Sequence, residues 1–149
     1  MLALMLLVRT ISPEETHPLR HAVLRPRQPL SAMVYPNDDG AETLHVGAFV
    51  DGALVGIASI YREGRPGRAE PHAWRLRGMA TTPEARRHGC GRAMLDALVA
   101  HARANHGRIL WCNGRVTAAP FYLALGFAQE GEAFELPGIG PHLLLHRAL

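Results

Sequence analysis

The chain has 149 residues, of which 48% are hydrophobic and 19% charged, so it is long enough and apolar enough to fold as one globular domain spanning residues 1–149. All 16 basic residues are arginine, and the formal net charge at neutral pH is +3. The arginines are scattered rather than clustered among aromatic residues, which argues against nucleic acid as a partner. The positive charge is compatible with a small anionic ligand.

The sequence lacks clear signals for export, disulfide bonding or metal binding. Residues 1–8 are apolar, but the segment is too short to cross a bilayer and is followed by Arg9, so we expect a buried first strand and no membrane association. Cys90 and Cys112 have no CxxC spacing, and the nine histidines are dispersed. We therefore expect a cytoplasmic protein without a metal site or a disulfide framework.

The first helix is predicted from its end signals. Ser12 is suited to cap a helix, and Pro13 is suited to its first position, where no backbone donor is needed. This helix should run through Val23 and end before Pro26.

The clearest turn signal is the dipeptide Asp51-Gly52, which favours a two-residue type I′ turn. It lies between two apolar runs, so we expect antiparallel strands at 43–50 and 53–61. A polar connection at 62–71 then leads to a third strand at about 73–81.

The second half of the chain alternates between helical and strand-like segments. In order, we expect a Gly-rich loop at 86–92, a helix to about Asn105, a strand at 109–112, a helix at 118–125 closed by Gly126, and strands at 127–132 and 142–147. This order predicts an α/β domain with a mixed sheet.

The loop at 86–92 has the composition of an anion-binding site. Gly89 and Gly91 allow a ligand to approach the backbone closely, and the free N–H groups of the first helical turn attract negative charge. Three arginines in the loop add positive charge. An ordinary surface turn is the alternative, because a Gly-rich loop alone is weak evidence.

Three features in the correct order resemble the GCN5-related N-acetyltransferase (GNAT) superfamily. Arg86-x-x-Gly89-x-Gly91 fits the family's pyrophosphate loop, Pro83-Glu84 precedes it at the usual distance, and residues 121–127, FYLALGF, match the family's FYxxLGF segment. The resemblance is most specific over residues 74–127. It implies a GNAT-like fold, a mixed and mostly antiparallel central sheet of six to seven strands with helices on both faces.

The resemblance also implies acetyl-CoA as co-substrate, no metal, and direct transfer of the acetyl group to an amine. Tyr122 is implied as the general acid that protonates the leaving thiolate, and Asn113, at the end of the strand beside the cleft, is a second candidate catalytic residue. The implied cofactor-binding residues lie on the strand and the loop: Met79, Ala80, Thr81, Arg86, Arg87, His88, Gly89, Cys90, Gly91 and Arg92. Tyr122 could instead be a core aromatic residue.

The general base is not assigned by the resemblance. Many relatives carry a carboxylate on the strand before the loop, where this chain has Arg75 and Arg77. The alternatives are Glu70, His142, an ordered water, or an acceptor that arrives already neutral.

The arginines indicate the chemistry of the acceptor. Arg75 and Arg77 share one strand face by alternation, and Thr81 should continue it. Together with Arg115 and His142 they form the candidate substrate-binding set, because a guanidinium binds a carboxylate or phosphate in a bidentate manner. The alternative is pairing within the protein, with acids such as Glu42, Glu70 or Glu135.

The sequence also leaves alternatives for the role of the cysteines and for the type of function. Cys90 and Cys112 are expected to be packing residues, with an acyl-enzyme at Cys112 as the alternative. The chain could be a non-catalytic acyl-CoA binding module, or it could acetylate a protein amine. We expect a small-molecule amine acceptor, and a homodimer would be in keeping with the superfamily.

Overall fold

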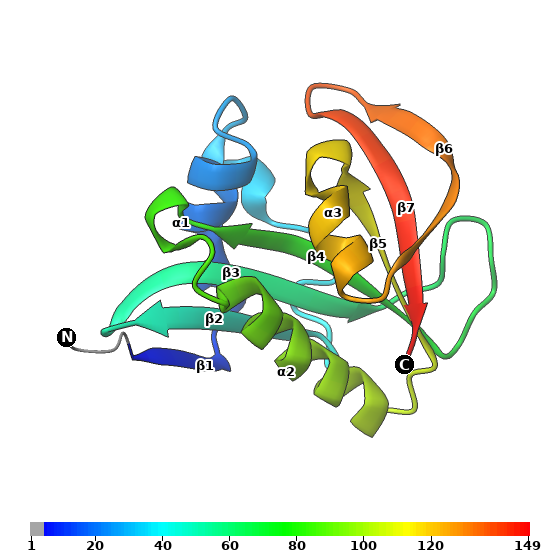
Figure 1. Cartoon of the computed structure of the whole chain (residues 1–149), viewed down its shortest axis with the longest axis horizontal. Coiled ribbons are helices and arrows are strands. Elements are labelled where there is room, and N and C mark those ends of the chain that lie inside the picture. The colour runs from blue at the N-terminus through cyan, green and yellow to red at the C-terminus, as the bar shows by residue number, and fades with distance from the viewer. Residues whose placement is uncertain (1–4) are drawn as a thin grey trace.

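A seven-stranded sheet with the order β1-β2-β3-β4-β5-β7-β6 runs through the molecule (Figure 1). The computed structural model describes residues 5–149. All neighbouring strands are antiparallel except β4 and β5. The strands are β1 (Leu6–Thr10), β2 (Leu44–Val50), β3 (Ala53–Arg62), β4 (Ala73–Thr81), β5 (Ile109–Arg115), β6 (Ala128–Leu136) and β7 (Gly140–Ala148). The predicted mixed, mostly antiparallel sheet is confirmed.

Helices cover both faces of this sheet, as predicted. They are α1 (Pro13–Leu19), which continues as the π-helix η1 (Arg20–Leu24), α2 (Cys90–Ala104) and α3 (Ala119–Ala124), with short 3₁₀ turns η2 (Leu30–Met33), η3 (Pro83–Ala85) and η4 (Val116–Ala118). The α1 side packs against one face, and α2 and α3 pack against the other. No helix within residues 5–149 is long and apolar enough to cross a membrane.

The N-terminal strand is not the buried strand that the sequence predicted. Residues 1–4 lie outside the described part of the chain. β1 is an edge strand that pairs only with β2, and the side chain of Leu7 is 56% exposed. The described strand β1 is therefore only partly buried, because it has a single neighbouring strand.

The predicted helix start and hairpin turn are confirmed. The Ser12 hydroxyl accepts from the Glu15 N–H while the Glu15 carboxylate accepts from the Ser12 N–H, a capping box. The helical segment ends at Leu24, before Pro26. Asp51 and Gly52 both have positive φ angles, 49° and 87°, as a type I′ turn requires.

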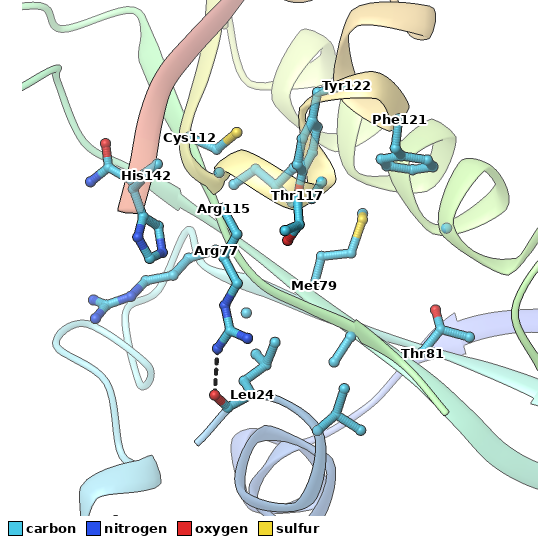
Figure 2. A pocket seen from close by; sticks show the side chains of 18 of the residues that line it. Leu24, Arg77, Met79, Thr81, Cys112, Arg115, Thr117, Phe121, Tyr122 and His142 are labelled. Atoms are coloured by element: carbon cyan, nitrogen blue, oxygen red, sulfur yellow. Dashed lines mark hydrogen bonds between the residues drawn. The ribbon is translucent and has the colours of Figure 1, made fainter. Parts of the chain in front are cut away.

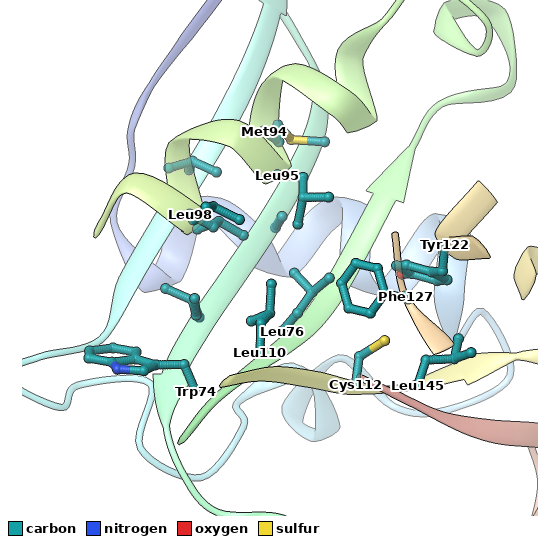
Figure 3. Packing of buried hydrophobic residues seen from close by; sticks show 14 of the residues in the cluster. Trp74, Leu76, Met94, Leu95, Leu98, Leu110, Cys112, Tyr122, Phe127 and Leu145 are labelled. Atoms are coloured by element: carbon teal, nitrogen blue, oxygen red, sulfur yellow. The ribbon is translucent and has the colours of Figure 1, made fainter. Parts of the chain in front are cut away.

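The main hydrophobic core lies between α2 and the sheet (Figure 3). Met94, Leu95 and Leu98 are almost fully buried, and they point from α2 toward Leu76 and Leu110 on the central strands. Each such side chain contributes roughly 1.5–3 kcal/mol on burial. This contact fixes the N-terminus of α2 next to the end of β4.

A β-bulge at Gly78 corrects one sequence-based expectation. Ser59 pairs with Arg77 and Ile57 pairs with Ala80, so two residues of β4 stand opposite one residue of β3. Gly78 has a φ of +66°. Because an extra residue reverses the alternation of faces, Thr81 does not continue the face of Arg77, and that prediction was wrong.

A buried polar cluster fastens the α1 side to the sheet. The Arg20 guanidinium makes a bidentate contact with Asp38, at 2.6 and 3.1 Å, and donates to Ser59 and Tyr61. The His45 ring contacts the Ser59 hydroxyl at 2.6 Å. Burial acts to raise the pKa of Asp38, but hydrogen bonds from Arg20, Tyr61 and Tyr35 outweigh it and hold the pKa below its ordinary value.

We expect Asp38→Asn to lower the free energy of unfolding by about 3–5 kcal/mol, because it leaves the Arg20 charge buried without its partner. The lowered pKa of Asp38 means that this stabilisation is present at neutral pH and is lost as the pH falls through the acidic range. Urea unfolding followed by circular dichroism measures the loss.

Glu42→Gln is the matched control, since the Glu42–Arg62 ion pair lies on the surface. It should change the free energy of unfolding by no more than about 1 kcal/mol. Equal losses in the two variants would contradict the role given to the buried pair.

Candidate functional site

The site is a cavity of about 1020 Å³ where β4 and β5 move apart (Figure 2). The two parallel strands pair at three positions only, from Ala73 with Ile109 to Arg75 with Trp111. Beyond them the cavity is lined from both sides of the sheet, by the α2 and α3 side and by the α1 side. We call the first the loop side, after the loop at residues 86–92. We call the second the arginine side, after Arg75, Arg77 and Arg115.

The loop side contains the predicted anion-binding loop. The first backbone hydrogen bond of α2 is donated by the Ala93 N–H to the Gly89 carbonyl. The N–H groups of the three preceding residues, Cys90, Gly91 and Arg92, therefore have no acceptor within the helix. Gly89 precedes the helix with a φ of +82°. The geometry expected for a helix N-terminus that holds an anion is therefore present.

Gly91 has a different reason for lacking a side chain. A Cβ at this position would lie 3.0 Å from the Phe121 ring and 3.9 Å from the Met79 sulfur. The glycine lets α3 pack close to the start of α2. Phe121 and Met79 both line the cavity, so this contact shapes its wall (Figure 2).

Most of the predicted cofactor-binding residues line this one cavity. These are Met79, Ala80, Thr81, Arg86, Arg87, Gly89, Cys90, Gly91 and Arg92. His88 is in the same loop, but it is exposed and is not among the lining residues. The Arg86 Nε donates a hydrogen bond to the Thr81 carbonyl at 3.2 Å, and this bond joins the loop to the end of β4.

Tyr122 projects from α3 into the wall between the two sides. Its ring lies edge-on to the rings of Phe121 and Phe127. It also packs close to Gly114, because a Cβ atom added to this glycine would lie 3.1 Å from the Tyr122 ring. Burial, together with the neighbouring Cys112, raises the pKa of the Tyr122 phenol. The phenol therefore keeps its proton at neutral pH, as a general acid must.

The cysteines have the surroundings of packing residues. Cys90 and Cys112 are buried free thiols. Burial raises the pKa of both, that of Cys112 to about 12. A thiol that stays protonated at neutral pH is a poor nucleophile. Within residues 5–149, no three His, Cys, Asp or Glu side chains are grouped to hold a metal ion.

On the arginine side, Arg75 is paired within the protein. Its guanidinium lies 2.9 Å from the Glu63 carboxylate and over the Trp111 ring. The alternative of internal pairing is therefore correct for Arg75, although its partner is Glu63 and none of the acids suggested from the sequence.

Arg77 has a different environment. Its guanidinium stacks on the Tyr35 ring, 4.2 Å from the centroid, and among the described residues it forms no ion pair. Arg25 approaches the same ring at 5.0 Å. Burial and the charge of Arg75 lower the pKa of Arg77, so this cation lacks the anion that would offset its desolvation.

Arg115 and Asn113 complete this part of the wall on β5. Arg115 donates to the Leu24 carbonyl at the end of η1, and this hydrogen bond joins β5 to η1 at the cavity wall (Figure 2). The Asn113 Oδ1 atom is buried and has no hydrogen-bond partner in the described protein. Asn113 lines the cavity, but this oxygen atom itself is covered by the surrounding protein.

The two candidate bases are in very different places. Glu70 accepts from the Arg65 guanidinium at 2.6 Å, and this hydrogen bond lowers its pKa to about 2. It does not line the cavity and cannot serve as a base there. His142 is 5% exposed and lines the cavity at the start of β7.

The charge of the cavity is entirely of one sign among the described residues. No aspartate or glutamate lines it, whereas seven arginines do: Arg25, Arg75, Arg77, Arg86, Arg87, Arg92 and Arg115. Such a wall attracts anions and disfavours a ligand that carries only positive charge.

Sequence reasoning missed the contribution of the segment after α1. Leu24, Arg25 and Tyr35 line the arginine side, as do Pro137 and Ile139 from the turn between β6 and β7. Nothing in the local sequence marks Tyr35 as a site residue, because its position depends on the buried contact between Arg20 and Asp38. Phe121 could have been found, since it begins the FYLALGF segment.

We expect Gly89→Ala to weaken acetyl-CoA binding at least tenfold, or about 1.4 kcal/mol, by calorimetry. The substitution strains a residue with a φ of +82°, where no neighbouring atom would clash, and so disturbs the loop amides alone. Gly52→Ala in the distant hairpin is the control, with a φ of +87° and equally open space. Both variants should lose roughly 1–2 kcal/mol of stability, but only the first should lose affinity.

The sequence of the chain matches a known protein family. The sequence profile of the acetyltransferase (GNAT) family matches residues 8–127. The uncharacterized N-acetyltransferase YitI of Bacillus subtilis (strain 168) is 38% identical over 146 residues, covering 97% of each chain.

Solved structures agree with the fold. The IAA acetyltransferase from Bacillus cereus has a TM-score of 0.73 at 17% identity, covering 97% of this chain and 100% of its own. FeeM, an N-acyl amino acid synthase from uncultured soil microbes, has a TM-score of 0.77 at 15% identity, covering 98% and 92%. The chain belongs to the GNAT family of acetyltransferases, and it is an acyltransferase that uses acetyl-CoA.

Proposed function

We propose that the protein transfers the acetyl group of acetyl-CoA directly to the primary amine of a small molecule that bears a carboxylate. The observation that carries this proposal is the arginine side of the cavity, where Arg77 is a half-buried cation without an anion. A carboxylate on the acceptor would supply the missing charge and accept from the guanidinium in a bidentate manner.

The acetyl-CoA would occupy the loop side. Its pyrophosphate would accept from the free N–H groups at the start of α2, and its pantetheine arm would run along Met79, Ala80 and Thr81. The thioester would then lie where β4 and β5 part, with the acceptor reaching it from the opposite face of the sheet. Donor and acceptor can be bound at the same time in this arrangement, which suits direct transfer.

The bond changes follow from these positions. The neutral amine attacks the thioester carbonyl, the C–S bond breaks, and the thiolate of CoA takes the proton of the Tyr122 phenol. The phenol regains a proton as the new amide nitrogen loses one. A backbone N–H near Met79 is suited to stabilise the carbonyl oxygen during attack.

The two other functions considered from the sequence are less well supported. A module that only binds acyl-CoA does not need a protonated phenol in the wall between the two sides. Acetylation of a protein amine favours an open groove with acidic or apolar lining, whereas the charged side chains among the described lining residues of this cavity are all arginines. We expect the reaction to take place in the cytoplasm, where thiols such as the two free cysteines stay reduced.

We expect the purified protein to bind acetyl-CoA in calorimetry and to release CoA thiol with at least one amine from a panel of amino acids, simple amines and peptides. Tyr122→Phe should lower kcat roughly 10²–10⁴-fold, because it removes the acid and little of the packing. Its affinity for acetyl-CoA should be unchanged. A protein that binds neither acetyl-CoA nor CoA would contradict the proposed function.

Arg77→Ala should raise the KM for the acceptor roughly 10–100-fold, because a charged hydrogen bond contributes about 1.5–3 kcal/mol. The KM for acetyl-CoA should not change, since Arg77 lies on the arginine side. Arg62→Ala, whose partner Glu42 is on the surface, is the control. An unchanged acceptor KM in Arg77→Ala would remove the carboxylate from the proposal.

A further inference from the structure

His142 is held in one tautomer by the backbone. Its Nδ1 lies 2.8 Å from the carbonyl oxygen of Gly140, two residues earlier in the chain. A carbonyl oxygen can only accept, so Nδ1 must carry the proton in this hydrogen bond. In a neutral imidazole the lone pair is then on Nε2.

The Nε2 atom is available to a ligand. It makes no hydrogen bond with any residue of the described chain, and the ring lines the arginine side of the cavity. In Figure 2 the ring of His142 lies beside the side chains of Arg77 and Arg115, which enter the same space. Arg115 is also its partner in the pairing of β5 with β7.

The other groups around His142 are poorer candidates for the base. Phe134 of β6 covers one side of the ring, with centroids 6.2 Å apart. The charged or titratable groups that share the arginine side with His142 are Arg25 after η1, Arg75 and Arg77 on β4, Arg115 on β5 and the Tyr35 phenol. Arginine side chains have no acceptor lone pair, and the guanidinium groups of Arg20 and Arg77 stack on the Tyr35 ring.

The remaining titratable groups of the cavity are also excluded. Tyr122 and Cys112 have raised pKa values and keep their protons. Cys90 has a raised pKa and lies on the loop side. No aspartate or glutamate of the described chain lines the cavity, and Glu70 is held by Arg65 away from it. Among the residues that the structure describes, His142 is the cavity-lining group that has a basic ring nitrogen, Nε2, without a hydrogen-bond partner.

We propose that Nε2 of His142 is the base that takes a proton from the ammonium group of the acceptor. The inference rests on the proposed acetyl transfer and assigns a further catalytic residue to it. The N–H bond of the ammonium breaks, the proton and Nε2 form a new N–H bond, and the freed lone pair attacks the thioester. The imidazolium releases this proton to solvent after the product leaves, which accounts for the one proton that the overall reaction produces.

The sharpest test is His142→Asn, because the Asn side-chain amide can still donate to the Gly140 carbonyl while no basic nitrogen remains. With the best amine of the panel, kcat/KM near neutral pH should fall roughly 10²–10⁴-fold. The loss should shrink as the pH rises, because more of the amine is then already neutral. Acetyl-CoA affinity should stay at the wild-type value, since the loop side is not altered.

His146→Asn is the matched control, on the same strand and outside the cavity lining. It should leave both kcat/KM and its pH profile unchanged. If His142→Asn retains wild-type kcat/KM and the same pH profile while Tyr122→Phe is impaired, acetyl transfer stands and His142 is not the base. If the wild-type protein does not bind acetyl-CoA, the proposed function itself fails.

A second measurement does not depend on finding the acceptor. Nitrogen-15 NMR of labelled histidine side chains, assigned by the signals lost in His142→Asn, should show His142 protonated on Nδ1 and bare on Nε2 at pH 8. The opposite tautomer, or a doubly protonated ring at that pH, would overturn the proposal.

Discussion

The parting of β4 and β5 is the constraint on which the site depends. The two strands are the only parallel neighbours within the described sheet, and they pair over three positions before they diverge. Parallel strands need a crossover, and here α2 supplies it and presents its N-terminus next to the gap. Where two strands of a sheet separate, their backbone groups lose their pairing partners, and here those groups border a cavity that is lined from both sides of the sheet.

The buried cluster around Arg20 and Asp38 supports the opposite wall. It ties η1 and the segment around Tyr35 to β3, and Tyr35 in turn supports the guanidinium of Arg77. The loop side is thus organised by backbone amides and the arginine side by side chains.

The single sign of charge in the cavity bears on how the reaction proceeds. In the proposed reaction, an ammonium group that enters among these arginines gains no ion pair from the cavity lining, and the proposed carboxylate on the same molecule would provide the attraction. It also means that deprotonation cannot rely on a carboxylate of the enzyme. A histidine whose tautomer is fixed by a main-chain carbonyl can do this without adding negative charge to the wall.

The sequence by itself determined the features that depend on local chemistry. The capping box at Ser12, the Asp51-Gly52 turn, the bounds of β4 and the loop before α2 follow from residue types a few positions apart. The tertiary structure alone decided that Arg75 has an ion-pair partner and that Arg77 has none within residues 5–149, because Glu63 and Tyr35 reach β4 from distant parts of the chain. It also decided, through the bulge at Gly78, that Thr81 and Arg77 face opposite sides, since register depends on how β3 and β4 meet and not on either strand alone.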